Sequence, residues 1–479
     1  MPNNVAKSIT GAQLSLQDCR EADQHAARLV RDEPALKSAL DFGPYVAQGK
    51  GQYPAILIGD QSEIPLLSPP TPPVLDHRMA LLGHDSDLVV LDRPDPDFCD
   101  YINSTLKKPG VSWLAAGSGA EPVARRCRED PKLRASLEAV VARAGGATLQ
   151  SYLTSGNTWR LAQSLGEATR MCVHVNGPSP RIARRANDKI WFTALARSVL
   201  GSDAVPPTMS AYGPAAAAGL VRRVARQGNQ IVIKVPDSAG SAGNIRLESE
   251  HVSRVPLAVI QKFLQRQLAA LGWRGGYPLL VGVWDSDVTC SPSVQMWLPR
   301  PETGQPHADG IFEQRVSGLR AAFVGGARST LPDHIQARLT HEALRIAAVL
   351  QRVGYYGRCS FDAVLVRDGN GGLRPHWIEC NGRWGGVSIP MTAAKSLVGG
   401  TPPEGLVMVQ TTDGDRRLSM LDLIRCLDPI LYRPDASTEG MVIVAPPGRV
   451  TSELTLMAMA GSQDRAERLM EMALTRLSL

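Results

Sequence analysis

The segment HWIECNGRWGG, residues 376–386, decides how the rest of the chain is interpreted. An apolar run carries one carboxylate, Glu379, followed at a spacing of two by Asn381 and Arg383 and then by a Gly pair. Side chains two positions apart on an extended segment point to the same face. The pattern therefore predicts a strand end that presents an acid, an amide and a guanidinium to one site.

A second carboxylate, Asp362, lies on the preceding strand-like run, CSFDAVLV at 359–366. The turn RDGNGG separates this run from LRPHWIEC at 373–380, which predicts an antiparallel hairpin with Asp362 facing Glu379. Two carboxylates and an amide oxygen suit Mg²⁺, and a cation relieves the repulsion between the two acids. We predict Asp362, Glu379 and Asn381 as metal ligands; a pair of surface carboxylates is the alternative.

Lys234 and the loop that follows it form the next feature. The lysine lies in the strand-like run NQIVIKVP at 229–236, where a buried ammonium is costly unless it is paired or offered to a ligand. The loop DSAGSAGN at 237–244 has small residues whose free backbone N–H groups can wrap a triphosphate. A solvent-exposed lysine and a merely flexible loop are the alternatives. The chain has no GxxxxGK[ST] loop, so a different nucleotide-binding fold is expected.

The order of these motifs resembles that of the ATP-grasp family over about residues 180–400. NDK with Lys189 at a helix start comes first, then Lys234 and its loop, then Asp362, and finally IECNGR with two following glycines. The resemblance implies ATP and Mg²⁺ as cofactors, with Lys189 and Lys234 contacting ATP. It gives Arg383 the stabilisation of the acyl-phosphate or tetrahedral species, and Arg358 is a second candidate with a similar reach. The implied ATP contacts of the lid loop are Ser238, Gly240, Ser241, Gly243 and Asn244.

The adenine-binding hinge departs from the usual family pattern, which carries acids. The matching stretch here is LLVGVWDSD at 279–287. Backbone groups can still bind adenine, so contacts with ATP are expected at Val281, Val283 and Trp284. Asp285 and Asp287 are both candidates for the ribose, and Asp287 is kept among the expected contacts.

Three domains are expected in 479 residues. Buried strand-like runs such as PAILIGD (54–60) and DLVVLD (87–92) alternate with helical patterns, which predicts an α/β domain over 1–180. The resemblance makes this a pre-ATP-grasp domain. The ATP-grasp domain is expected over 181–408, in the α/β class and with the α+β topology of the ATP-grasp fold. Its lid is expected at about 205–285. A small C-terminal α+β domain is expected over 409–479.

The N-terminal domain, the wording GRWGGVSIP and the C-terminal extension narrow the resemblance to pheganomycin-type peptide ligases. This resemblance implies an ATP-dependent ligase that forms an amide bond through an acyl-phosphate, with release of ADP and phosphate, in antibiotic peptide biosynthesis. The implied acyl donor is a guanidino-bearing arylglycine acid, and the implied acceptor is an amino acid or peptide. SGNTWR at 155–160 is a candidate for the donor pocket.

Two other functions stay open, a phosphotransferase on the same scaffold and a non-catalytic ATP-binding protein. The sequence identifies no dedicated general base. His307 and His376 are candidates, although each is more often structural.

Composition narrows the class of protein further. The net charge is only +6, which does not indicate a nucleic-acid partner. No apolar run is long enough for a membrane span, and the eight scattered cysteines favour a reducing compartment, so we expect a cytoplasmic protein. A homodimer is possible on the family resemblance. The arginine clusters at 181–185 and 222–226 are either solvated helix faces or attract phosphate-bearing ligands.

Overall fold

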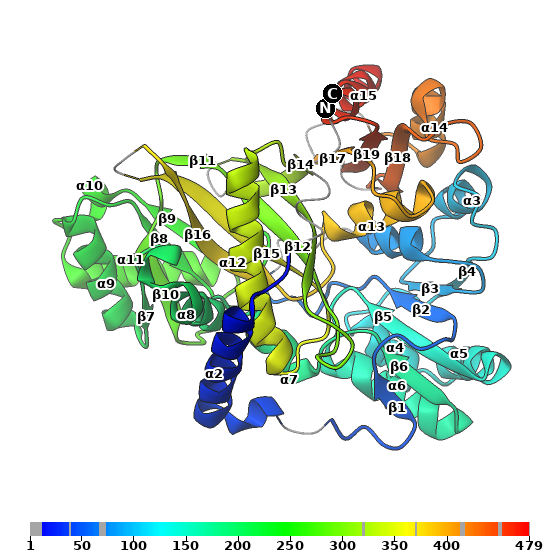
Figure 1. The fold of residues 1–479 in the computed structure, drawn as a ribbon, viewed down its shortest axis with the longest axis horizontal. Coiled ribbons are helices and arrows are strands. Elements are labelled where there is room, and N and C mark those ends of the chain that lie inside the picture. The colour runs from blue at the N-terminus through cyan, green and yellow to red at the C-terminus, as the bar shows by residue number, and fades with distance from the viewer. Residues whose placement is uncertain are drawn as a thin grey trace.

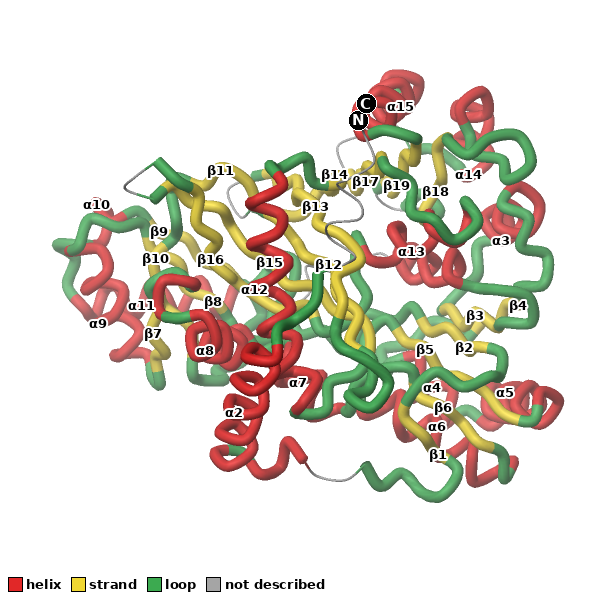
Figure 2. Tube along the Cα trace, viewed as in Figure 1, coloured by secondary structure: helices red, strands yellow, loops and turns green. Residues whose placement is uncertain are grey.

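The computed structural model describes residues 12–37, 40–66, 73–318, 321–368, 371–411, 417–448 and 453–478. Figure 1 shows three sheets, and Figure 2 shows that helices flank each of them. Within the described ranges no helix is both long and apolar enough to cross a membrane.

The first sheet is parallel and has the strand order β1-β6-β5-β2-β3-β4. Alternate residues of β2 face opposite sides of the sheet, with Ile56 and Ile58 in one core and Leu57 in another. Burial on both faces explains why the strands of this sheet are continuous apolar runs in the sequence. The strands are Val46–Gln48 (β1), Ala55–Ile58 (β2), Leu88–Leu91 (β3), Ser112–Ala115 (β4), Gly146–Ser151 (β5) and Cys172–Val175 (β6). The helical elements of this part are Pro73–Leu82 (η2), Pro96–Asp100 (α3), Val123–Glu129 (α4), Pro131–Ala144 (α5) and Gly156–Thr169 (α6).

The second sheet is antiparallel, with the order β7-β10-β8-β9. Ile231 and Ile233 of β8 pack in the core shared with the helices, and by alternation Lys234 points to the opposite face. This alternation explains a lysine inside an apolar strand. The strands are Thr208–Ala211 (β7), Ile231–Lys234 (β8), Asn244–Leu247 (β9) and Leu279–Val283 (β10). The helices are Pro214–Arg226 (α9), Ser249–Val252 (α10) and Leu257–Ala270 (α11).

The third sheet has nine strands and carries the hairpin predicted from the sequence. Its order is β11-β15-β12-β13-β14-β17-β19-β18, with β16 paired to β15. The strands are Val288–Cys290 (β11), Pro292–Leu298 (β12), His307–Ser317 (β13), Ala322–Arg328 (β14), Gly357–Arg367 (β15), Leu373–Asn381 (β16), Gly405–Thr411 (β17), Gly440–Ala445 (β18) and Leu454–Ala460 (β19). The remaining helices are Leu16–Asp32 (α2), Pro180–Ala186 (α7), Lys189–Leu200 (α8), Asp333–Arg352 (α12), Ser388–Leu397 (α13), Met420–Leu427 (α14) and Gln463–Leu477 (α15).

Helix α12 lies across this sheet in Figure 1, and helices α2 and α8 pack against α12. Buried residues of α8, α12, β12, β15 and β16 form one core, including Phe192, Phe361 and Trp377. Because α8 is anchored to β16 through this core, Lys189 at its start is held beside the end of the hairpin.

Several expectations about elements need correction. A helical pattern at 12–40 in the sequence predicts an N-terminal helix, which spans only Leu16–Asp32, because Ser15 caps it and the chain leaves the helix at Glu33 before Pro34. The strands that were not predicted are β1, β4, β5, β7, β9, β11, β13, β17 and β19. The tip of the hairpin turn, 369–370, lies outside the described residues.

The C-terminal strands extend the third sheet. β17 contains the expected domain boundary at 408 and pairs with β14 on one side and with β19 on the other. The hydrogen-bonded sheet is therefore continuous across that boundary, and the proposed division into three domains stays a prediction.

Candidate active site

The hairpin brings its two acids directly opposite one another. Asp362 pairs with Glu379 in the β15–β16 register, and the register then shifts so that Ile378 is bulged out. A bulge of this kind redirects the residues beside it. The predicted cross-strand juxtaposition of the two carboxylates is present.

Asp362 is almost fully buried and held by neutral donors. Ser293 Oγ donates to Asp362 Oδ1 at 2.6 Å, and Asn381 Nδ2 donates to Oδ2 at 2.8 Å. Burial, together with the charge of Glu379, raises the pKa of the Asp362 carboxyl to about 6. The protein therefore holds two acids in a place where a further positive charge is favourable.

Glu379 already has one cationic neighbour. Lys189 Nζ lies 2.9 Å from Glu379 Oε2, and it also donates to the backbone carbonyl of Ser238 in the lid loop. Burial would raise the pKa of Glu379, but the charges of Lys189, Lys234 and Arg383 outweigh it and hold that pKa below its usual value. Helix α8, strand β16 and the lid loop thus meet at one carboxylate.

Lys234 lies on the same side of the second sheet as the site. Burial, opposed in part by Glu379, lowers the pKa of the Lys234 ammonium to about 8. The described residues offer Lys234 no ion pair within 4.0 Å, so its charge is free for a ligand.

The lid loop folds back on itself. Ser238 Oγ donates to the carbonyl of Val235 at 2.9 Å, and a Cβ on Gly243 would lie only 2.2 Å from that hydroxyl oxygen. Gly240 and Ser241 have positive φ values of 59° and 61°, and Ser241 Oγ donates to the carbonyl of Ala321. A glycine is therefore required at position 243, because the Ser238 side chain approaches too closely for a Cβ atom.

Arg383 is positioned by a residue far away in the sequence. Asn187 Oδ1 accepts from Arg383 Nη1 at 2.6 Å and from the backbone N–H of Gly382 at 3.1 Å. A Cβ on Gly382 would lie 2.9 Å from the Ala186 Cβ, which explains the glycine between Asn381 and Arg383. Arg383 Nε is buried without a hydrogen-bond partner among the described residues, so the guanidinium retains a free donor.

Some of these groups line a cavity of about 320 Å³ between the first sheet and the hairpin. Its walls include Lys189, Glu379, Asn381 and Arg383, as well as Ser155 and Gly156 from the segment SGNTWR, which the sequence suggested for the donor pocket. Asp362 and Lys234 are not part of its lining.

Three further charged residues line this cavity. Arg184 belongs to the first arginine cluster, and Asp237 is the first residue of the lid loop. Glu63 was not predicted, and no local motif marks it, because its place at the cavity follows from the packing of separate parts of the chain.

The hinge residues line a second cavity of about 590 Å³, together with residues of the β15–β16 hairpin. Val281 is fully buried in the core beneath the second sheet, whereas Val283 and Trp284 reach the cavity. The backbone N–H groups of Val283 and Trp284 donate to the carbonyls of Pro207 and Gln230, so their carbonyl oxygens are the groups left for a ligand.

Both candidate ribose acids lie at this second cavity, in different settings. Asp285 Oδ2 lies 2.9 Å from Nδ1 of the buried His376, so this carboxylate already has a hydrogen-bond partner within the protein. Asp287 is exposed and lies 3.5 Å from Arg367. His376 and the exposed His307 do not line the first cavity, so the structure brings neither candidate base to the hairpin acids.

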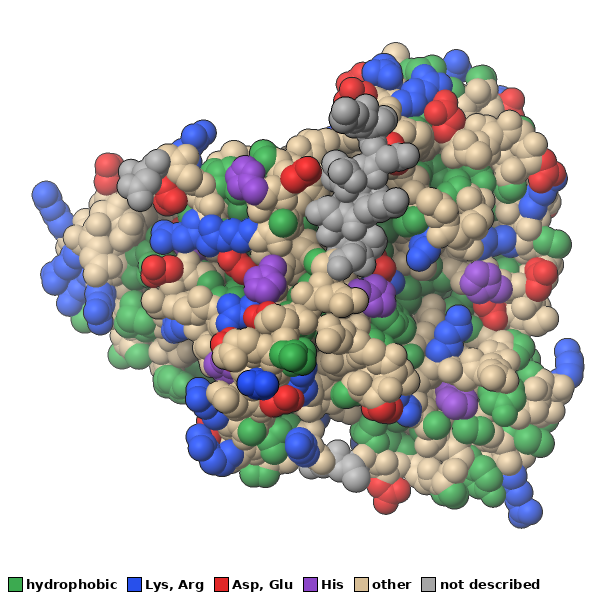
Figure 3. Space-filling view, viewed as in Figure 1, with side chains coloured by type: hydrophobic (Ala, Val, Ile, Leu, Met, Phe, Trp, Pro, Cys, Tyr) green, Lys and Arg blue, Asp and Glu red, His purple; other side chains and the backbone are tan. Residues whose placement is uncertain are grey.

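The arginine clusters have separate environments. Arg185 pairs with Glu33 at 2.8 Å, whereas Arg184 is exposed at the rim of the first cavity. Lys and Arg side chains gather at the edge of the molecule that carries α9, which contains the second cluster (Figure 3). That second cluster lines neither cavity.

Arg358 lies outside the first cavity. Its guanidinium pairs with Asp309 and lies 5.5 Å from the ring centroids of Trp297 and Trp384. Its Nε, like that of Arg383, is buried without a hydrogen-bond partner among the described residues, but the positive charge of Arg358 is balanced by Asp309 within the protein.

Arg358→Met is therefore expected to lower the free energy of unfolding by about 3 kcal/mol, because it leaves Asp309 without its cation and removes the stacking. Urea denaturation followed by tryptophan fluorescence measures this change. The matched variant Arg367→Met, on the same strand but 61% exposed, should change stability by about 0.5 kcal/mol or less. Equal effects of the two variants would contradict a structural role for Arg358.

The residues at the hairpin end fit a divalent cation. Two carboxylates converge there beside the amide of Asn381, whose nitrogen donates to Asp362. Burial and the charge of Glu379 together raise the pKa of Asp362, and a cation would stabilise its ionised form. Among the described residues no cluster of three or more His, Cys, Asp or Glu forms a metal site, so further ligands would be water and substrate oxygens.

Comparison with known proteins concerns the fold. Residues 76–167 match the family model of the pre ATP-grasp domain. No curated protein sequence matches the chain. Biotin carboxylase from Campylobacter jejuni, solved with βγ-ATP, is similar with a TM-score of 0.56 at 14% identity, over 89% of this chain and 91% of that one.

Two further solved structures share the fold. The biotin carboxylase domain dimer of 2-oxoglutarate carboxylase from Hydrogenobacter thermophilus, with MgADP, ADP and bicarbonate, has a TM-score of 0.54 at 14% identity, over 89% of this chain and 90% of that one. N5-carboxyaminoimidazole ribonucleotide synthetase from Thermus thermophilus has a TM-score of 0.50 at 15% identity, over 88% and 97%. The chain thus shares the α/β fold of these enzymes over most of its length, and residues 76–167 match the pre ATP-grasp domain.

Proposed function

We propose that the chain is an ATP-dependent carboxylate–amine ligase. The observation that carries this proposal is the convergence of Glu379, Asn381 and Arg383 with Lys189 and the lid loop at one cavity. Asp362 lies opposite Glu379 on the neighbouring strand. Such a site can neutralise the charge of a triphosphate beside the carboxylate that is to be activated. The solved relatives bound to ATP analogues or ADP support nucleotide binding.

The proposed reaction has two steps. A carboxylate oxygen of the donor attacks the γ-phosphorus of ATP, forming an O–P bond while the bond to the β–γ bridging oxygen breaks and ADP departs. The amine nitrogen then attacks the acyl carbon, the C–O bond to phosphate breaks, and the nitrogen releases one proton to solvent. The protein's contribution is positioning and charge stabilisation.

The residues divide this work. Lys189 and Lys234 offer ammonium groups to phosphate oxygens, and the lid loop excludes water that would hydrolyse the activated acyl group. Arg383, which lines the cavity, offers its guanidinium to the oxygen that gains negative charge. Asp362, Glu379 and Asn381 would hold Mg²⁺, which supplies electrostatic stabilisation of the phosphates when it is bound.

Hydroxylamine provides the direct test, because it replaces the unknown amine and traps an activated acyl group as a hydroxamate. The purified chain is incubated with ATP, Mg²⁺, hydroxylamine and a library of carboxylic acids, and the products are read by mass spectrometry. We expect hydroxamate, ADP and phosphate in equal amounts. A stable phosphorylated alcohol instead would identify a phosphotransferase, and nucleotide binding without any product would identify a non-catalytic protein.

The affinity for nucleotide is expected to fall as the pH rises above about 8. Burial places the pKa of Lys234 near 8, so the free protein loses this positive charge there, while bound phosphates would retain the proton to higher pH. Between about pH 8 and the ordinary lysine pKa of about 10.4 the unfolded chain binds more protons, so this group makes the free protein more stable as pH rises. Calorimetric titration with MgADP from pH 6.5 to 9.5 measures the affinity.

Lys234→Met should abolish the fall in MgADP affinity above about pH 8. Lys262→Met, at an exposed position on α11, should retain this fall. An affinity that is flat across this range in the wild type would show that Lys234 does not meet the phosphates.

The narrower assignment follows the resemblance to pheganomycin-type ligases. We propose an amino-acid-like or guanidino-bearing acyl donor and an amino acid or peptide acceptor, in peptide natural-product biosynthesis. A homodimer is proposed by analogy with the dimeric carboxylase domain. Sedimentation of the full chain tests the oligomeric state.

A further inference from the structure

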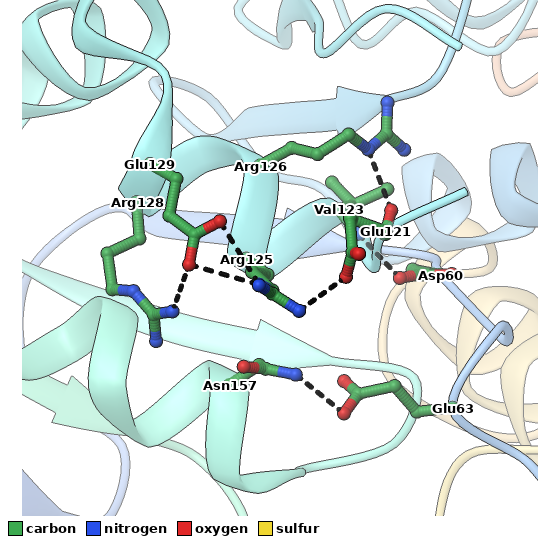
Figure 4. Close-up of polar contacts among 9 residues, drawn as sticks. All are labelled: Asp60, Glu63, Glu121, Val123, Arg125, Arg126, Arg128, Glu129 and Asn157. Atoms are coloured by element: carbon green, nitrogen blue, oxygen red, sulfur yellow. Dashed lines mark hydrogen bonds and ion pairs between the residues drawn. The ribbon is translucent and has the colours of Figure 1, made fainter. Parts of the chain in front are cut away.

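Glu63 lies on the wall of the first cavity that faces the hairpin site, and nothing in the proposed reaction uses it. Its loop follows β2 and is fixed by Asp60, whose two carboxylate oxygens accept from the backbone N–H groups of Ser62 at 2.8 Å and Val123 at 2.7 Å. Figure 4 shows Asp60 at Val123 and Glu63 at Asn157, on neighbouring parts of the pre-ATP-grasp domain. The position of Glu63 is therefore set by the first domain's own hydrogen bonds.

Two neutral donors orient the Glu63 carboxylate. Ser155 Oγ donates to Oε2 at 2.5 Å, and Asn157 Nδ2 donates to Oε1 at 2.9 Å. A carboxylate can accept about four hydrogen bonds, so each oxygen retains an acceptor site. In the described part of the chain no Lys, Arg or His forms an ion pair with Glu63, and its charge is left for a partner from outside.

The opposite wall carries the complementary charge. Arg383 also lines the cavity, with its Nη1 held by the neutral Asn187 and no ion pair within 4.0 Å among the described residues. Lys189, by contrast, is paired with Glu379. The cavity thus has an acid without an ion pair on the first domain and a guanidinium without one on the hairpin side, and Arg184 and Asp237 also belong to its lining.

Apolar side chains occupy the walls between these charges. They are Ile64, Pro65, Leu153, Ala183 and Ala239. Unpaired charges in a partly enclosed apolar cavity are costly, and a ligand with charges of both signs separated by carbon satisfies both at once.

We propose that Glu63 is a specificity-determining residue that binds a cationic nitrogen, an ammonium or a guanidinium, on the acyl donor. The donor's carboxylate points toward Arg383 and its cation toward Glu63, so the substrate is a zwitterionic acid. This inference rests on the proposed ligase function and adds to it the residue that recognises the cationic group of the donor. Ser155 and Asn157 are positioning residues, because they act through Glu63.

Matched donor pairs test the proposal in the hydroxamate assay with the full chain. Each pair replaces a cationic group by a neutral one of similar shape: alanine and isobutyrate, phenylglycine and 2-phenylpropionate, 4-aminobutyrate and pentanoate, arginine and citrulline. A site whose half-buried acid has no cationic partner in the protein should prefer the cationic member by roughly 100-fold or more in kcat/KM for the best pair.

Glu63→Gln keeps the shape of the side chain and removes its charge. It should lower kcat/KM for the cationic donor by roughly 30- to 100-fold, mainly through KM, and bring the ratio within the pair close to one. Glu129→Gln is the matched control, because Glu129 lies on α4 of the same domain, pairs with Arg125 and Arg128, and does not line the cavity (Figure 4). MgADP affinity and thermal stability should be unchanged in both variants.

The outcomes separate this inference from the proposed function. Hydroxamate formed equally well from the neutral acids, or a donor preference that survives in Glu63→Gln, overturns the role of Glu63 and leaves the ligase function standing. Absence of hydroxamate from every donor in a wild-type protein that binds MgADP overturns both. Loss of the preference in Glu63→Gln with unchanged MgADP binding supports the proposal.

Discussion

Glu379→Gln is expected to reduce ATP-dependent hydroxamate formation by roughly a thousandfold or more. The substitution removes the charge of a proposed metal ligand at the point where phosphate charge must be neutralised. It also removes the partner of Lys189, which lies 2.9 Å away and is buried. Initial rates at saturating ATP, together with the Mg²⁺ concentration needed for half-maximal rate, measure the effect.

Loss of stability must be separated from loss of chemistry in this variant. An unpaired buried ammonium can cost about 3–5 kcal/mol, so Glu379→Gln alone is expected to unfold more easily. The double variant Lys189→Met with Glu379→Gln should recover most of that stability without recovering activity. Glu302→Gln, at an exposed acid, is the matched control for removal of a charge.

Two results would contradict the assignment of Glu379. One is a single variant that retains more than a tenth of the wild-type rate with unchanged Mg²⁺ dependence. The other is a double variant that recovers activity along with stability, since the role of Glu379 would then be confined to pairing with Lys189.

Arg383→Ala is expected to lower the rate of hydroxamate formation about 100- to 1000-fold, with MgADP affinity changed little. Arg383 lines the cavity and its guanidinium is oriented by Asn187, as expected for a donor to developing negative charge. Arg383→Lys should not restore the rate, because a lysine lacks the planar set of donors. Single-turnover measurements isolate the chemical step.

Chemical rescue makes this test specific. Added guanidinium ions should recover part of the rate in Arg383→Ala and none in Glu379→Gln. Arg184→Ala, at an exposed arginine of the same cavity, is the control and should change the rate by less than about tenfold. Weakened MgADP binding with an unchanged rate for the bound complex would place Arg383 at the nucleotide and not at the acyl group.

Local pattern was sufficient for the central hairpin. The alternation of Glu379, Asn381 and Arg383 and the turn before them predicted the cross-strand pairing with Asp362. Strands β13, β17 and β19 were missed, because their assignment depends on neighbours in the nine-stranded sheet more than on their own composition.

The local sequence pattern could not predict which side chains far apart in the sequence would contact one another. Arg358 has the same residue type as Arg383, yet only the fold shows that Trp297, Trp384 and Asp309 surround it. Glu63 was unremarkable in the sequence, and it became a candidate because β2 and α6 carry it to the cavity that Arg383 enters.

The segment HWIECNGRWGG by itself determined the spacing of an acid, an amide and a guanidinium along one extended strand, because side-chain direction in a strand depends only on parity. Tertiary structure decided what surrounds them. Asn187 holds Arg383, Lys189 meets Glu379, and a Cβ on Gly386 would lie 3.0 Å from the ring of Phe323, so this glycine serves packing against β14. These contacts join parts of the chain that only packing of the domains brings together, and no local spacing encodes them.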